Sequence, residues 1–273
     1  MISVLMSVYQ KENPEWFSRA VRSITVGQTR PPEELILVAD GELTPALEEK
    51  ISECEKSLRN SPTLLRVVRL RENRQLGRAL RIGMRHCRGE LIARMDTDDI
   101  AVPERLRLQE TYLLEHPGIA ACGGAIAEFE TEGEILRVKH MPESPEKVRS
   151  YGKFRNPLNH MAVMFRKEAV ERAGGYMHFP LLEDYHLWSR MLAGGEKIAN
   201  LPDVLAEARI GDDFAEKRGG LKYFLRYQKL RKLQRKWGIL TLPEYIESLI
   251  LTFVMTMQPR RMRKVVYKIL RGN

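Results

Sequence analysis

The chain has 273 residues and 43% hydrophobic content, enough for one large α/β domain with an appendage, and no apolar run reaches the 18 residues typical of a membrane-spanning helix. Met1 runs straight into a strand-like segment, so no signal peptide is expected, and three cysteines without metal-site or redox spacing favour a reduced cytoplasmic compartment. The net charge of +9 belongs to the tail, because residues from 217 onward carry 15 Lys and Arg against two acids, a net of +13 that leaves −4 for residues 1–216.

The first hundred residues alternate short apolar runs with amphipathic segments, which is the pattern of βαβ units on a parallel sheet. We expect strands over 2–8, 34–39, 64–70 and 90–95. Two helices begin where Asn13-Pro14 and Thr44-Pro45 supply an N-cap residue followed by proline at the first helical position. A third helix is expected over 75–87, and the predicted fold class is therefore α/β.

From residue 103 onward the pattern is mixed. A helix is expected over 103–115, and two strands over 119–129 and 134–139 are joined by a hairpin at Thr131-Glu132-Gly133. Further expected elements are a strand from His160 to Phe165, helices over 167–173 and 183–193, and tail helices over 215–236, 243–257 and 260–270. With the shift in charge, this divides the chain into an α/β domain over 1–215 and a basic, amphipathic helical tail over 216–273.

Three carboxylates follow the fourth expected strand within four positions, at Asp96, Asp98 and Asp99. Like charges this close repel one another and raise each other's pKa unless something cationic lies among them. A divalent cation held by carboxylate oxygens removes that cost, and oxygen ligands favour magnesium or manganese. An acidic loop that caps the helix after Pro103 explains the same residues without a metal, and the motif alone leaves both interpretations open.

Polar residues also follow two other strands of the expected parallel sheet. Ser7 and Tyr9 lie at the end of the first strand, and Asp40 follows the second. In open α/β sheets, ligands bind beyond the carboxyl ends of the strands. The sequence therefore predicts that these residues and the acidic cluster share one binding edge.

Five motifs in chain order resemble the family 2 glycosyltransferases. They are Ser7-Val8-Tyr9, Leu37 to Gly41, Asn73 to Gly77, Asp96 to Asp99, and Leu182 to Tyr185. The resemblance covers residues 2–210 but not the tail, and the closer likeness is to bacterial exopolysaccharide and lipopolysaccharide enzymes of the amylovoran-biosynthesis type. It implies a GT-A fold, a Rossmann-like mixed sheet flanked by helices. It also implies an inverting enzyme that moves a sugar from a nucleotide-sugar, expected to be UDP-linked, to a hydroxyl of a bacterial surface glycan.

The resemblance implies roles in donor binding for the first three motifs. Tyr9, two residues after Ser7, would stack on the uracil, and Asp40 would accept a charge-assisted hydrogen bond from the base. Arg74 precedes a helix N-terminus, where backbone N–H groups favour anions, and it would reach the diphosphate. The structural alternatives are a tyrosine packed at a strand end, a simple turn at Asp40, and a solvated basic helix face for Arg74.

In the fourth motif, Asp96 and Asp98 match the two acids of the family's DXD motif, with Asp99 adjacent. The resemblance implies that these three residues hold the ribose and a Mn²⁺ or Mg²⁺ ion, without saying which residue does which. The metal would act as a Lewis acid and as a template for the departing nucleotide.

The fifth motif supplies a carboxylate that can take the proton of the acceptor hydroxyl. The resemblance assigns this role to Asp184, with Glu183 as the second choice, and a single displacement would invert the anomeric centre. Acids in the first turn of a helix also stabilise its dipole, which is the alternative explanation. His160 matches a stretch that lies near the acceptor in relatives, although a lone histidine is more often structural.

The tail interleaves apolar residues with Lys and Arg, as in helices that lie on an anionic membrane. This suits a lipid-linked acceptor and an enzyme peripheral on the inner face of the plasma membrane. The structural alternative is that the helices pack on the domain and present a solvated basic face. No nucleic-acid-binding motif is recognised, so no nucleic acid partner is expected. A nucleotidyltransferase is an alternative function, but no glycine lies between Tyr9 and Asn13 to form its phosphate loop. A non-catalytic sugar-nucleotide-binding protein is the other alternative.

Overall fold

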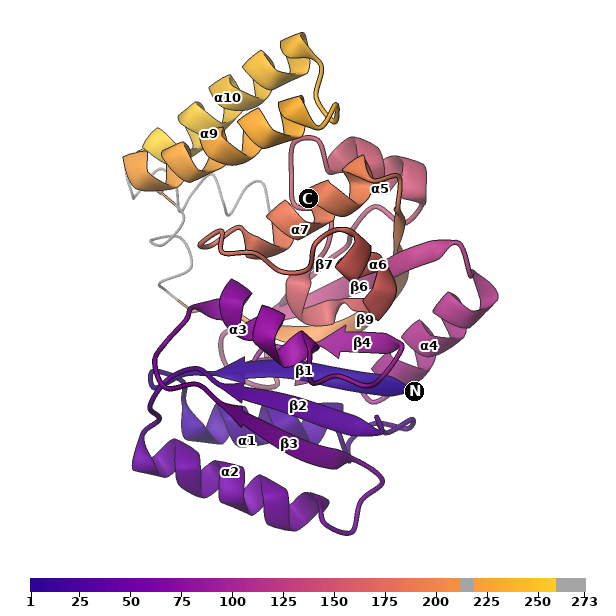
Figure 1. The fold of residues 1–273 in the computed structure, drawn as a ribbon, viewed down its shortest axis with the longest axis vertical. Coiled ribbons are helices and arrows are strands. Elements are labelled where there is room, and N and C mark those ends of the chain that lie inside the picture. The colour runs from indigo at the N-terminus through magenta and orange to yellow at the C-terminus, as the bar shows by residue number, and fades with distance from the viewer. Residues whose placement is uncertain (212–218, 259–273) are drawn as a thin grey trace.

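One mixed β-sheet organises the protein, in a computed structural model that describes residues 1–211 and 219–258 (Figure 1). Its strands are β1 Ile2–Val8, β2 Glu34–Ala39, β3 Leu64–Arg69, β4 Leu91–Arg94, β5 Ile100–Ala101, β6 Ile119–Phe129, β7 Ile135–Lys139, β8 Met164–Arg166 and β9 Lys197–Arg209. They lie in the order β3-β2-β1-β4-β8-β6-β9-β5, and β7 pairs with β6 beside this path. The GT-A expectation of a mixed sheet is met.

The parallel part of the sheet follows the sequence expectation closely. Strand β1 pairs in parallel with β2 and β4, and β2 pairs in parallel with β3. The carboxyl ends of β1, β2 and β4 therefore lie at one edge. Strand β8 then runs antiparallel between β4 and β6, and the hairpin of β6 and β7 is confirmed as an antiparallel pair.

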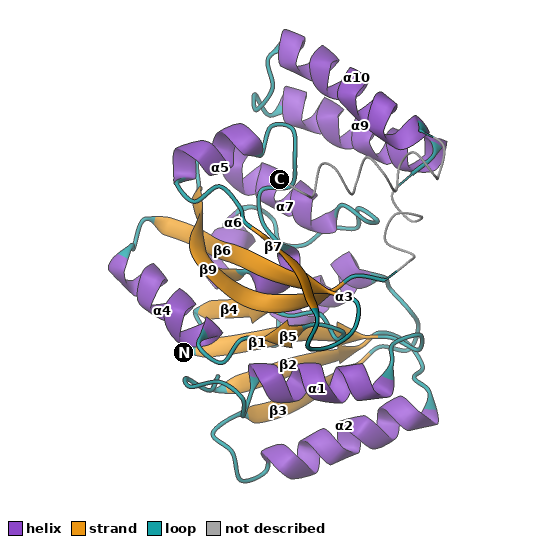
Figure 2. Ribbon diagram, turned by 180° about the vertical axis from the view of Figure 1, so that it is seen from behind, coloured by secondary structure: helices purple, strands orange, loops and turns teal. Residues whose placement is uncertain are grey.

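Helices cover both faces of the sheet (Figures 1 and 2). They are α1 Pro14–Ile24, α2 Pro45–Leu58, α3 Leu76–Met84, α4 Arg105–Glu115, α5 Pro145–Tyr151, α6 Lys167–Arg172 and α7 Glu183–Ala193. On β2, Leu35 and Leu37 pack in one apolar cluster with α1 and α2. Ile36 and Val38, on the opposite face, join a second cluster with α3 and α7. With both faces buried, the carboxyl edge is the part of the sheet left for a ligand.

The expected helix starts are confirmed at α1 and α2. Asn13 Oδ1 accepts hydrogen bonds from the N–H groups of Glu15 and Trp16, at 2.9 and 3.1 Å. Thr44 Oγ1 accepts from the N–H of Leu47 at 3.3 Å. Asn13 pairs with two of the orphan N–H donors of a helix N-terminus and Thr44 with one, which is why these local signals predicted the boundaries correctly.

The expected strand from His160 to Phe165 is wrong in its first half. Residues His160–Ala162 form a 3-10 turn, η1, and only β8 continues as strand. The turn forms because the carbonyl of Asn159 accepts from the N–H of Ala162 at 2.9 Å, while the Asn159 amide donates to the carbonyl of Gly124 at 3.0 Å. Strands β5 and β9 and helix α5 were not predicted.

The tail forms a helical hairpin of α9 Leu221–Lys236 and α10 Leu242–Met257, at the end of the molecule opposite α2 (Figure 1). This confirms two of the three expected tail helices. The expected helix over 260–270 and the boundary at residue 215 lie outside the described residues. Within 1–211 and 219–258, no helix combines the length and the hydrophobicity needed to cross a membrane.

Candidate active site

A cleft of about 490 Å³ opens at the carboxyl edge of the sheet. Strand ends supply Ser7, Tyr9, Glu12, Asp40, Asp96, Thr97 and Asp98, and the segments that begin α3 and α7 supply Asn73, Gln75, Leu76, Gly77, His178, Phe179, Pro180, Leu181 and Glu183. The prediction that three strand ends meet at one edge is therefore confirmed, since residues from all three line the same cleft. The five motifs all contribute residues to its wall.

Backbone strain gathers at this cleft. Gln75, with φ of 67°, and Leu181, with φ of 68°, are the two non-glycine residues with positive φ in the described part of the chain. Both line the cleft. A positive φ is costly for residues with a side chain, and such strain is concentrated in proteins at binding and catalytic sites.

Gly77 lets the wall of the cleft close, because it brings the start of α3 against the segment that leads into α7. A Cβ atom at Gly77 would lie 2.6 Å from the carbonyl oxygen of Met177 and 3.1 Å from Cβ of Glu183. Both neighbours would have to move away. Glycine is required here by the close approach of two backbones.

We therefore expect Gly77→Ala to widen the wall and to lower kcat/KM by about 10- to 100-fold, since small displacements of positioning groups are costly in catalysis. The measurement is steady-state kinetics together with a thermal melt. Gly118→Ala is the matched control, because no atom lies within 4 Å of its added Cβ. Equal activity of the two variants would contradict this account of the wall.

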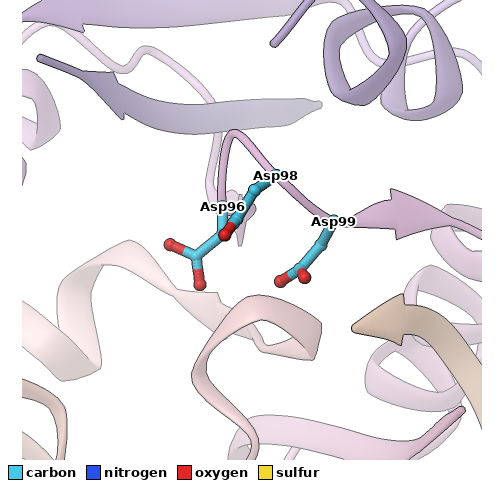
Figure 3. A group of neighbouring side chains, drawn as sticks. All are labelled: Asp96, Asp98 and Asp99. Atoms are coloured by element: carbon cyan, nitrogen blue, oxygen red, sulfur yellow. The ribbon is translucent and has the colours of Figure 1, made fainter. Parts of the chain in front are cut away.

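The acidic loop between β4 and β5 brings its three carboxylates together. Oxygens of Asp96, Asp98 and Asp99 all lie within 4.8 Å of one another, and the side chains project to the same side of the loop (Figure 3). Arg94, the last residue of β4, is buried and pairs with both oxygens of Asp96. Asp99 Oδ1 accepts from the N–H of Arg209 at 2.8 Å. Its Oδ2 is buried without a hydrogen-bond partner among the described residues.

Electrostatics show that this loop has a surplus of negative charge. Burial, followed by the nearby Asp96, raises the pKa of Asp98 to about 6. Burial and the neighbouring Asp98 raise the pKa of Asp99 well above its usual value. Arg94 pairs with Asp96, and the charges of Arg94 and Arg209 both oppose the rise at Asp98, yet the pKa of Asp98 and of Asp99 stays raised. The remaining surplus and the unpartnered Asp99 oxygen fit a hard divalent cation with oxygen ligands.

Sequence reasoning missed Arg94 and Arg209. The sequence predicted a cation near the three acids. The feature that could have located it is Arg94, the one charged residue of β4, two residues before Asp96. Arg209 ends β9, and its guanidinium lies over the rings of Trp16 and Phe129, at 4.0 and 4.6 Å from their centroids. No local pattern places it at the acidic loop, because that contact depends on the unpredicted pairing of β9.

Of the residues in the first three motifs that are expected to bind the donor, three line the cleft and one does not. Ser7 and Tyr9 line the cleft, and burial, with smaller effects of Glu12 and Asp98, raises the pKa of Tyr9. Asp40 also lines the cleft, but its Oδ1 already accepts from the N–H of Arg74 at 2.6 Å. The Arg74 side chain is half exposed, pairs with Glu72 at 2.8 Å and is not among the lining residues.

Two adjacent carboxylates begin α7 in different surroundings. Asp184 accepts from the amide of Asn156 at 2.5 Å and from the N–H of Tyr185 at 2.7 Å, so its position is fixed. Glu183 lines the cleft. Burial, followed by the charge of Asp184, raises its pKa to about 7. The structure thus places Glu183 in the wall of the cleft and Asp184 directly beside it.

His160 does not line the cleft. It is 9% exposed, its Nε2 lies 2.9 Å from the hydroxyl of Tyr176, and its ring packs near Trp188. Burial, with a smaller effect of Arg94, lowers its pKa well below the usual value. This arrangement gives His160 a packing role, and the expected contact with the acceptor finds no support in it.

Comparison with known proteins places this geometry in a family. Residues 3–173 match the model of "Glycosyl transferase family 2". The amylovoran biosynthesis glycosyltransferase AmsE of Erwinia amylovora is 39% identical over 86% of this chain and 85% of its own length. The UDP-Gal:alpha-D-GlcNAc-diphosphoundecaprenol beta-1,3-galactosyltransferase of Escherichia coli is 31% identical over 97% and 94%. Because 97% of the chain aligns, the similarity extends into the tail, beyond the expected limit at residue 210.

Solved structures show the same fold at low identity. S. aureus TarS, residues 1–349, in complex with UDP-GlcNAc, superposes with a TM-score of 0.66 and 16% identity over 100% of this chain and 76% of that one. The mannosyltransferase PcManGT of Pyrobaculum calidifontis, in complex with GDP-Man and Mn²⁺, superposes at 0.59 and 16% identity over 100% and 80%. Fold, site and sequence agree, and the chain belongs to glycosyl transferase family 2.

Proposed function

We propose that this glycosyltransferase moves a sugar from a UDP-sugar to a hydroxyl of a bacterial surface-glycan acceptor, with inversion at the anomeric carbon. The observation that carries the proposal is the cleft itself, which gathers Tyr9, Asp40, the acidic loop and Glu183 in one wall. The relative from E. coli is named for a UDP-galactose donor, and the TarS structure contains UDP-GlcNAc. These names support the choice of a uridine nucleotide.

In the proposed binding mode, the base of the donor lies between Tyr9 and Asp40, with Ser7 beside them, and the diphosphate lies toward the start of α3. Arg74 would act through its backbone N–H, which orders Asp40. Asp96, Asp98 and Asp99 would hold Mn²⁺ or Mg²⁺ together with the ribose. When bound, the cation supplies Lewis-acid stabilisation of the charge that develops on the departing nucleotide.

The chain's own contribution to the chemistry is a proton acceptor and its placement. We assign Asp184 as the base, because its two hydrogen bonds fix its position, with Glu183 as the competing candidate in the wall of the cleft. The acceptor oxygen attacks the anomeric carbon while its proton passes to the carboxylate. The bond between the anomeric carbon and the phosphate oxygen breaks, and its electron pair leaves with UDP. One such displacement inverts the anomeric centre.

The acceptor in this proposal is a glycan carried on a lipid, and the enzyme works peripherally on the inner face of the plasma membrane. The E. coli relative is named for an undecaprenol-linked acceptor. The basic sequence of the tail supports the same location, since clustered Lys and Arg attract anionic lipid headgroups.

A panel of UDP-glucose, UDP-galactose, UDP-GlcNAc and GDP-mannose, each with and without Mn²⁺, tests the donor by thermal melting. We expect one UDP-sugar with Mn²⁺ to raise Tm by several degrees, since a ligand at about 100 times its Kd stabilises by about 2.7 kcal/mol. GDP-mannose should leave Tm unchanged. Stabilisation by GDP-mannose alone, or equal shifts without metal, would contradict the proposed donor and its metal.

A further inference from the structure

Helix α10 has its polar and apolar faces reversed relative to an ordinary surface helix. Its buried face is formed by Ser248, Thr252 and Thr256, which are 1%, 8% and 4% exposed. The opposite face, by contrast, exposes large apolar side chains to between 42% and 59%. These are Leu242, Ile246, Ile250, Leu251, Phe253, Val254 and Met257. A helix that packs on a protein core shows the opposite arrangement.

The buried polar face is complete without any other partner. Each hydroxyl donates within its own helix, from Ser248 to the carbonyl of Tyr245 at 2.8 Å, from Thr252 to that of Ser248 at 2.6 Å, and from Thr256 to that of Thr252 at 2.8 Å. These small residues let α10 approach α9 closely, as small residues do between membrane helices. The apolar face is therefore left outward by the way the hairpin is built.

We propose that the outward face of α10 docks on an anionic lipid bilayer, with its apolar side chains buried in the interface. Exposed apolar surface of this extent marks an interaction site. From Ser248 to Gln258 the sequence contains no charged residue, so this half of α10 can enter the interface without burying a charge. At 16 residues, α10 is about 24 Å long and lies along the bilayer rather than across it.

Charge selects the bilayer over a second copy of the chain. Helix α9 carries seven Lys and Arg without one acid, and residues 259–273 of the sequence carry six more, again without an acid. Of the α9 cations, Lys222, Lys229, Lys232, Arg235 and Lys236 are exposed. Two copies docked through this hairpin would bring like charges together, whereas phosphatidylglycerol headgroups supply the opposite charge.

The hairpin is fixed to the wall of the cleft, so docking also orients the active site. Arg231 of α9 is buried and donates to the hydroxyl of Tyr185 at 2.7 Å, one residue after Asp184. Tyr223 and Leu230 of α9 share an apolar cluster with Phe179, which lines the cleft. This inference rests on the proposed function for its purpose, because a lipid-linked acceptor would then reach the cleft from the membrane side.

The test is flotation of the full-length protein with vesicles of phosphatidylethanolamine and phosphatidylglycerol, compared with vesicles of phosphatidylcholine alone. We expect binding to the anionic vesicles and weaker binding at high salt. Ile250→Glu combined with Val254→Glu should lower the vesicle-bound fraction about tenfold or more, because two apolar anchors become charged. Leu251→Glu, on the same face, should act in the same direction.

Leu114→Glu is the matched control, since Leu114 is a 69% exposed leucine on α4, away from the hairpin. Activity on a soluble acceptor analogue should be equal in all these variants, which separates docking from transfer. Wild-type binding by the double variant would overturn the proposal. So would a wild-type dimer, seen by size exclusion with light scattering, that the double variant converts to monomer, because the face would then join two copies.

Discussion

Asp98→Asn is expected to lower metal-dependent transfer about 10²- to 10³-fold and at the same time to stabilise the metal-free protein. Asp98 lines the cleft, and its pKa is raised to about 6 by burial and by Asp96. Loss of one charge-stabilising contact at a reacting centre costs about 10²- to 10³-fold in kcat. The measurements are kcat/KM with Mn²⁺ and the shift in Tm that Mn²⁺ produces, both of which should collapse in the variant.

The effect on stability follows from the direction of the pKa shift. Because the folded-state pKa of Asp98 lies above the unfolded value of 3.8, the metal-free protein loses stability as pH rises through about 6. At pH 7.5 the ionised carboxylate is therefore a liability, which asparagine removes. We expect the metal-free Tm of Asp98→Asn to exceed that of the wild type at pH 7.5, with a smaller difference at pH 5.

Asp203→Asn is the control for this substitution, because Asp203 is an exposed aspartate on β9. It should change neither activity nor the Mn²⁺-induced shift in Tm. The acids do not cap α4, whose N-cap is Glu104 without a side-chain hydrogen bond, so the alternative of a helix-capping loop is wrong. An Asp98→Asn enzyme that kept both would show that the acidic loop holds no metal. The enzymatic family would stand, but the proposed metal site would not.

The second large effect concerns the base. We expect Asp184→Asn to lower kcat by about 10²- to 10⁴-fold, the usual contribution of a positioned general base, with donor affinity unchanged. Glu183→Gln should retain most of the activity. Donor affinity is measured by calorimetry with a non-hydrolysable UDP-sugar analogue, and turnover is measured by UDP release.

The pH profile separates the two carboxylates. Glu183 and Asp184 interact, so the pair titrates as a unit, and the pKa of Glu183 is raised to about 7. Wild-type kcat/KM should therefore rise with pH to a plateau above about 7. Glu183→Gln leaves one carboxyl in place of the interacting pair, so the rising limb of its profile should move to lower pH. Loss of turnover in Glu183→Gln, with a shifted profile in Asp184→Asn, would assign the base to Glu183 instead.

Local signals predicted the first half of the fold. Asn13-Pro14 and Thr44-Pro45 cap helices through atoms within three residues, so their meaning does not depend on the rest of the chain. The same signal at Ser144-Pro145, whose Ser144 hydroxyl accepts from the N–H of Lys147, would have located α5. It was present in the sequence and was not used.

Elements whose structure depends on residues far away in the sequence could not be predicted from local patterns. Strand β9 is a strand because it pairs in parallel with β6 over most of its length, and its Leu201-Pro202-Asp203 segment reads locally as a turn. The apolar run from His160 to Phe165 resembles a strand. Its first half is a 3-10 turn, held in place by the hydrogen bond from the Asn159 side-chain amide to the carbonyl of Gly124. The sequence near these residues does not indicate that β6 is the pairing partner of β9 or that Gly124 is the acceptor for Asn159.

The sequence predicted which residues lie at the candidate site better than it predicted where their side chains point. The sequence located the acids and the edge at which they lie. It did not reveal that Glu183 enters the wall of the cleft, because adjacent residues in the first turn of a helix point in different directions. It also treated Arg74 as a side-chain contact, whereas the structure uses its backbone N–H to hold Asp40.

The pairing of Arg94 with Asp96 has a consequence for the resting enzyme between turnovers. A guanidinium built into the end of a buried strand is a permanent counter-charge, present whether or not product and ion have departed. The loop therefore keeps one of its carboxylates aimed and neutralised during reloading. Under the proposed function, exchange of ion and nucleotide would then involve adjustment at Asp98 and Asp99 only, and little reorganisation would precede the arrival of the next donor.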